Sequence, residues 1–163
     1  MYPSQKTNEG YTFETNRGEK YLVYFTQLRN WDHLFKESGI SPNKFYYIGV
    51  ERLTPKRGGK PDIYIKRTIA YILFDFFVSN SEAILLFNYS NSDKRILSRR
   101  RRFKMWFDFY APHTLLQLFQ QDFGDEVTVC ALYQRHGALE FDKLRTNIQN
   151  LIKNMGQSAG IEK

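Results

Sequence analysis

Seven basic side chains gather within eleven residues of this chain, and cationic groups at that density can bind phosphate. The seven are Lys94, Arg95, Arg99, Arg100, Arg101, Arg102 and Lys104. The whole chain has 24 Lys and Arg against 17 Asp and Glu, so the charges of the other residues balance. The net charge of +7 is therefore local, which indicates a binding surface or an internal pairing rather than a generally basic protein.

Three of the arginines would share one stripe on a helix, and an aromatic residue ends that stripe: Arg95, Arg99, Arg102 and Trp106. A guanidinium group presents its donors in a planar fork that matches a phosphate group. Trp106, Phe109 or Tyr110 could stack a nucleic-acid base. The structural alternative is that the arginines flank an apolar helix face and pair with carboxylates on neighbouring strands. An acidic protein is the other partner that such a surface would suit.

A second basic segment lies at residues 55–61, where two prolines, two glycines and three cations predict a loop. Its cations, Lys56, Arg57 and Lys60, would form a supporting edge for a polyanion. The segment lacks the glycine and lysine spacing of a phosphate-binding P-loop. We therefore expect a basic surface loop rather than a nucleotide site.

Residues that could perform catalysis or hold a metal form no recognisable motif. The Pro-Asp pair at residues 61–62 is reminiscent of a two-metal nuclease core, but no later acidic residue has a lysine two positions after it, as that core needs. His33, His113 and His136 lack metal-binding spacing, and Cys130, the single cysteine, cannot form a thiol cluster. The sequence thus indicates no catalytic residue, no metal site and no cofactor, and an enzyme of unrecognised type is the third alternative.

The elements that would position these side chains follow from periodicity. A glycine-containing turn between residues 11–15 and 21–25 predicts a hairpin. Further strands are expected at 45–53, 62–66, 83–87 and 126–133, and helices at 30–39, 68–78, 93–110 and 141–155, while 115–119 is ambiguous. Hairpins come first and helices later, which predicts an α+β fold. In that fold N-terminal antiparallel strands, as a hairpin or meander, carry two or three helices on one face and a C-terminal amphipathic helix.

The segment D-x-R-x-x-x-R-x-R-x-F-x-x-W-F, which begins at Asp93, resembles an uncharacterised family of short bacterial proteins known only as a domain of unknown function. The hairpin with Tyr11 and Phe13 and the helix entry at residues 65–69 are similar too. The resemblance runs from about Gly10 to the last helix. It implies a bacterial, single-domain protein, and it transfers no catalytic residue.

Length and composition predict one folded domain over residues 1–163, with flexible ends at 1–9 and 156–163. The longest apolar run, near residues 69–78, contains Asp75 and is too short to span a bilayer. The N-terminus shows no apolar signal-peptide stretch. Together with the single cysteine, these features predict a cytoplasmic protein without membrane contact, and they leave its oligomeric state open.

Overall fold

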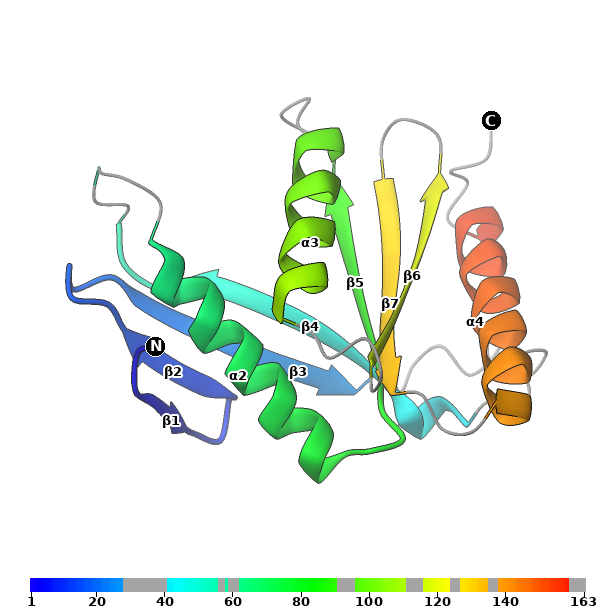
Figure 1. The fold of residues 1–163 in the computed structure, drawn as a ribbon, viewed down its shortest axis with the longest axis horizontal. Helices are drawn as coiled ribbons and strands as arrows, with labels where there is room; N and C mark the ends of the chain where they lie inside the picture. Colours follow the sequence, from blue (N-terminus) through cyan, green and yellow to red (C-terminus); the bar gives the residue numbers. More distant parts are fainter. Residues whose placement is uncertain are drawn as a thin grey trace. The chain divides into compact units, whose positions relative to one another are not determined.

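The computed structural model describes residues 1–27, 41–55, 58, 62–90, 96–110, 116–123, 127–134 and 138–158 (Figure 1). The chain divides into two compact units. The first unit comprises Met1–Thr26 and Ile48–Ser81, and the second comprises Gln27–Tyr47 and Glu82–Lys163. Each unit is described by itself.

The first unit is an antiparallel meander with one helix on a face. Its strands follow chain order as β1 (Ser4–Lys6), β2 (Tyr11–Glu14), β3 (Lys20–Gln27) and the end of β4 (Phe45–Arg52), and its helix is α2 (Ile63–Ser79). The turn between β2 and β3 forms because Thr15 Oγ1 accepts hydrogen bonds from the backbone amides of Arg17 and Glu19. Gly18 supplies the left-handed φ of 71° that this turn requires. The hairpin prediction is confirmed.

The core of the first unit lies between this sheet and α2. Tyr11 and Phe13 point to one face of β2, opposite Val23 and Tyr21 of β3, and they pack with Ile72 of α2. Thr12 and Glu14, the intervening residues, therefore point to the other face. Figure 1 shows α2 lying along the first of these faces.

The second unit is a mixed sheet that carries helices on both faces. The start of β4 runs parallel to β5 (Ile84–Ser90), which pairs antiparallel with β7 (Val127–Gln134), and β7 pairs antiparallel with β6 (Leu116–Phe123). A short 3-10 turn, η1 (Pro42–Lys44), precedes β4, and the helices are α3 (Ile96–Tyr110) and α4 (Ala138–Ser158).

Alternate residues of β5 show how the two helices are placed. Ile84 and Leu86 pack in one cluster with Ile148 of α4, whereas Phe87 contacts Phe103 of α3. Neighbouring residues of a strand point to opposite faces. The two helices therefore cover opposite faces of this sheet. The α+β class itself is confirmed.

Two sequence-based assignments differ from the structure. Residues 62–66 form the start of α2 and not a strand, because Asp62 caps the helix by accepting a hydrogen bond from the Tyr64 amide at 2.8 Å. Within residues 1–9, where we expected a loose chain, Ser4–Lys6 pairs with β2 and Tyr2 is buried. The segment 115–119, whose sequence pattern favours neither a helix nor a strand, overlaps strand β6. The helix predicted at 30–39 lies outside the described residues.

Candidate functional site

Helix α3 carries five of the seven residues of the basic cluster, and its apolar side chains set its orientation. Phe107 is only 6% exposed. Phe103 is partly buried, with its ring centroid 4.7 Å from that of Phe87 in β5. These two side chains anchor α3, and the interval of four residues between them places both rings on one side of the helix. Arg101 and Lys104, which the same helical phase places on the far side, are exposed.

The outer side of α3 mixes cationic and apolar groups. Leu97, Met105 and Phe109 are exposed there, and Phe109 reaches 75%. The ammonium group of Lys104 lies 2.9 Å from a carboxylate oxygen of Asp108, one turn away. Because this pair is exposed, it contributes only about 0.3–0.5 kcal/mol to stability. The pair matters more for the charge of the surface, because Asp108 offsets the positive charge of Lys104.

The other predicted contacts fall into two groups. Arg99 and Arg102 lie in α3, seven and four residues before Trp106, so the helix places all three on adjoining turns. Arg95, Lys56, Arg57 and Lys60 lie outside the described residues. The structure therefore places two of the three arginines of the predicted stripe on the same helix as Trp106.

The aromatic end of α3 differs in accessibility from residue to residue. Trp106 is half-buried, with its ring 5.0 Å from Phe103 and 6.2 Å from Tyr110, measured between centroids. Its indole Nε1 is inaccessible to solvent and has no hydrogen-bond acceptor among the described residues. Phe109 packs edge-on against Tyr110 at 4.8 Å but exposes most of its ring. Phe109 is thus the most accessible of the three stacking candidates. In the sequence, the only signal of this exposure is the position of Phe109 on the helix, away from the apolar face.

Asp62, the residue that suggested a nuclease, has a structural role. Besides capping α2, it accepts a hydrogen bond from the phenol of Tyr2. Burial alone would raise the pKa of Asp62, but the hydrogen bonds donated by Tyr2 and by the Tyr64 amide outweigh it and hold this pKa below its ordinary value. Among the residues described, no three His, Cys, Asp or Glu side chains are grouped so that they could hold a metal.

A second tyrosine–aspartate pair ties β2 to α2. Tyr11 donates a hydrogen bond to Asp75 at 2.7 Å. Burial, together with this hydrogen bond, raises the pKa of Tyr11 to about 12. The raised pKa of Tyr11 and the lowered pKa of Asp62 suit structural links and not a general acid that works near neutral pH.

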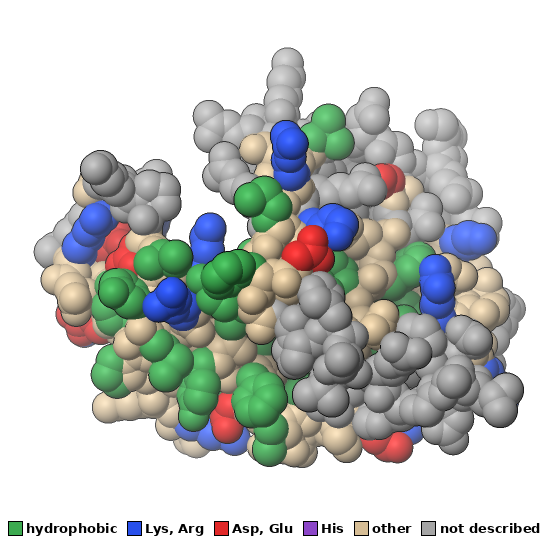
Figure 2. All heavy atoms as spheres, viewed as in Figure 1, with side chains coloured by type: hydrophobic (Ala, Val, Ile, Leu, Met, Phe, Trp, Pro, Cys, Tyr) green, Lys and Arg blue, Asp and Glu red, His purple; other side chains and the backbone are tan. Residues whose placement is uncertain are grey.

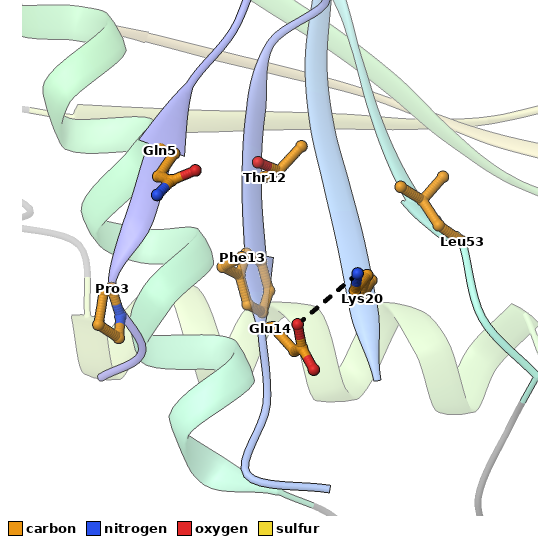
Figure 3. Close-up of a pocket in the computed structure, with 7 residues that line it drawn as sticks. All are labelled: Pro3, Gln5, Thr12, Phe13, Glu14, Lys20 and Leu53. Carbon is orange, nitrogen blue, oxygen red and sulfur yellow. Dashed lines mark ion pairs between the residues drawn. The ribbon is translucent and has the colours of Figure 1, made fainter. Parts of the chain in front are cut away.

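A shallow cavity of about 460 Å³ opens on the first unit. Its lining residues are Pro3, Gln5, Thr12, Phe13, Glu14, Lys20 and Leu53 (Figure 3). Its two charged residues face each other, with Lys20 Nζ 3.9 Å from a Glu14 oxygen. The lining thus has no net charge to attract a polyanion, and no sequence motif marks these residues.

Residues 61–134 match the model of a family of unknown function (DUF6169). The match extends from the residue before the Asp62 cap to the end of β7, so it includes α2, β5, α3 and β6. It supports the expected uncharacterised domain over a shorter stretch than the resemblance covered. No match was found among curated proteins. No helix in the described part of the chain is both long enough and apolar enough to cross a bilayer.

Proposed function

We propose that the protein binds polyanions, with nucleic acid as the ligand, through helix α3. The observation that carries this proposal is the local charge. Residues Ile96–Tyr110 contain five basic residues and a single acidic one, Asp108, which is paired with Lys104. The positive charge of the remaining cations is thus not offset within the helix.

Contacts to phosphate would dominate this interaction. Arg95, Arg99 and Arg102 would bind the nucleic-acid backbone, and the loop with Lys56, Arg57 and Lys60 would support its edge. Phosphate contacts carry no sequence information, so we expect little sequence preference. The exposed ring of Phe109, or Trp106 after a small movement, would stack an unpaired base.

Fluorescence anisotropy with labelled single-stranded RNA and duplex DNA across a salt series tests the proposal. If three arginines displace counterions, the slope of log K against log salt is roughly −2 for a single strand and −2.7 for a duplex. The triple variant Arg95→Ala, Arg99→Ala, Arg102→Ala should weaken binding and flatten this slope.

A charge-matched control lies on α4, where Lys143, Arg145 and Lys153 are exposed. Replacing these three by alanine removes the same formal charge from another helix. If the α4 variant weakens binding as much as the α3 variant, general charge and not α3 is responsible. Failure of the wild-type protein to bind at low salt would refute the proposal outright.

A protein-interaction or regulatory module with an acidic partner is the second candidate. It is favoured by the exposed Leu97, Met105 and Phe109 beside Arg101, because interfaces combine apolar anchors with arginine. Such an interface would show a flatter salt dependence than phosphate binding. Met105→Ala and Phe109→Ala would then cost more affinity than the arginine replacements.

The remaining proposals concern the origin and location of the protein. We infer a bacterial, cytoplasmic protein in which the D-x-R-x-x-x-R-x-R-x-F-x-x-W-F segment is the family's distinguishing motif. The single thiol of Cys130, which is buried, supports a reducing compartment. Cell fractionation of the source organism tests this location. Recovery of the protein in the membrane fraction or the secreted fraction would contradict it.

A further inference from the structure

Helix α2 of the first unit has an apolar face that its own sheet does not use. Thr68, Ile72 and Phe76 are buried on the inner side. On the outer side Tyr64, Tyr71, Phe74 and Val78 are 46% to 65% exposed, and Ile63 adjoins them at 51%. Figure 2 shows hydrophobic side chains gathered along this part of the surface. We call these five residues the α2 stripe.

The spacing of the α2 stripe is that of a helix that pairs with another helix. Tyr64, Tyr71 and Val78 recur every seven residues, and Phe74 occupies the position between the last two. The equivalent position between Tyr64 and Tyr71 is Arg67. Apolar residues that alternate at intervals of three and four form the contact line of paired helices.

The size of the α2 stripe matches that of a small but specific interface. A fully buried aromatic side chain covers roughly 150–250 Å², so half of Tyr64, Tyr71 and Phe74 amounts to roughly 225–375 Å². Ile63 and Val78 extend the apolar area to roughly 400–500 Å², which is the size of the largest apolar patch on a typical monomer, and such a patch often has a function. Two such patches facing each other bury close to the ~1,000 Å² at which specific interfaces begin.

Charge decides the orientation of such a pair. If two α2 helices ran parallel, Arg67 of one copy would lie against Arg67 of the other. In an antiparallel pair centred on residue 69, Arg67 faces Tyr71 of the other copy, and Tyr64 faces Phe74. Arg67 already lies over an aromatic ring, with its guanidinium carbon 5.8 Å from the centroid of Tyr64. The antiparallel pair would give the Arg67 guanidinium a second aromatic ring to contact, that of Tyr71 in the other copy.

The helix dipoles favour the same orientation. In an antiparallel pair the partial positive start of each α2 helix lies toward the partial negative end of the other, whereas parallel helices would place like ends side by side.

We propose that the α2 stripe binds a second copy of this chain, and that the two α2 helices pack antiparallel about a twofold axis. Each copy supplies the same patch, so the interface closes on itself and limits the assembly to a dimer. The partner of this surface is thus the protein itself and not a nucleic acid or a peptide.

Sedimentation velocity at protein concentrations from about 1 to 200 μM tests the proposal. We expect a concentration-dependent shift from the 19.4 kDa monomer to a species of twice that mass. Tyr71→Glu should raise the dissociation constant at least about 30-fold, as loss of a central anchoring aromatic does. Leu53→Glu, at a residue of the same unit that is 52% exposed and outside the stripe, is the matched control and should leave dimerisation unchanged.

Cross-linking tests the orientation independently of affinity. The native Cys130 is buried, so an introduced cysteine is the accessible thiol. A mixture of Tyr64→Cys and Phe74→Cys proteins should form a disulfide-linked pair, whereas Tyr64→Cys alone should not. Cross-linking of Tyr64→Cys with itself would indicate parallel helices and overturn the proposed arrangement.

Two other outcomes would overturn the proposal. One is a wild-type protein that stays monomeric at 200 μM. The other is a monomer in which Tyr71→Glu lowers the melting temperature, because the stripe would then be covered by another part of its own chain. Circular dichroism of each variant confirms that a lost dimer does not result from a lost fold.

Discussion

Replacing Trp106 with phenylalanine should leave the protein at least as stable as the wild type. A large-to-small change at a packed aromatic residue normally destabilises a protein. Trp106 differs because its indole Nε1–H is shielded from water and finds no acceptor among the described residues. Phenylalanine removes this unsatisfied donor and keeps an aromatic ring beside Phe103 and Tyr110.

The magnitudes of the two effects decide the sign. The smaller ring gives up roughly 50 Å² of apolar surface, or about 1.2 kcal/mol at 25 cal/mol per Å². Because Trp106 is mostly but not fully buried, up to about 1 kcal/mol of this is lost. A shielded polar group without a partner costs about 1–3 kcal/mol. The net expectation is a change between zero and about 2 kcal/mol of added stability.

Urea unfolding followed by far-ultraviolet circular dichroism measures this difference, since tryptophan fluorescence would itself change. Phe107→Ala on the same helix is the reference for ordinary core loss, and burial of all but 6% of Phe107 predicts a cost of about 3–5 kcal/mol. If Trp106→Phe loses more than about 1 kcal/mol, the indole donor has a partner and the reasoning is wrong.

Three further changes test the local physics. Gly10→Ala should cost about 2–4 kcal/mol in urea unfolding, because Gly10 has a φ of 147° and a Cβ there would lie 2.3 Å from the carbonyl oxygen of Val23; Gly58→Ala, with open space around it, is the neutral control. Tyr11 has a folded-state pKa of about 12, above its ordinary value near 10, so its contribution is present below pH 10 and is lost as the pH rises toward 12. Between those values the wild type should lose ~1–2 kcal/mol more than Tyr11→Phe, and equal losses would contradict the pKa. The double replacement of Arg101 and Lys104 by alanine should change stability by less than about 0.5 kcal/mol, since both side chains are exposed, and a larger loss would mean a wrong helical phase.

The helices and most strands could be predicted because burial imposes a period on the sequence. Ile72 and Phe76 of α2, or Phe103 and Phe107 of α3, recur at the helical interval that puts them on one buried face. The start of α2 was misjudged because residues 63–65 are Ile-Tyr-Ile, which favours a strand locally. The capping hydrogen bond from the Tyr64 amide to Asp62 and the rest of the helix override that local preference.

Contacts between distant residues explain what the sequence could not show. Tyr2 donates its amide to the Thr68 hydroxyl at 2.8 Å and its phenol to Asp62, which brings the N-terminal segment next to the start of α2. Thr68 and Asp62 lie 66 and 60 residues from Tyr2 in the chain, and no local sequence pattern predicts such contacts. The opposite placement of α3 and α4 is likewise a property of the sheet between them, because it depends on which residues of β5 face each helix.

The two proposals make a joint prediction that neither makes alone. A dimer through the α2 stripe carries two copies of α3 whatever the distance between them, so a long nucleic acid could engage both and a short one only one. Wild-type protein should then bind a long single strand more tightly than Tyr71→Glu does, while the two proteins bind an oligonucleotide of about ten nucleotides equally. Linkage requires the converse as well: the long strand, and not the short one, should promote dimerisation. If Tyr71→Glu weakens binding to both lengths alike, the α2 stripe itself contacts the ligand, and the assignment of binding to α3 alone fails.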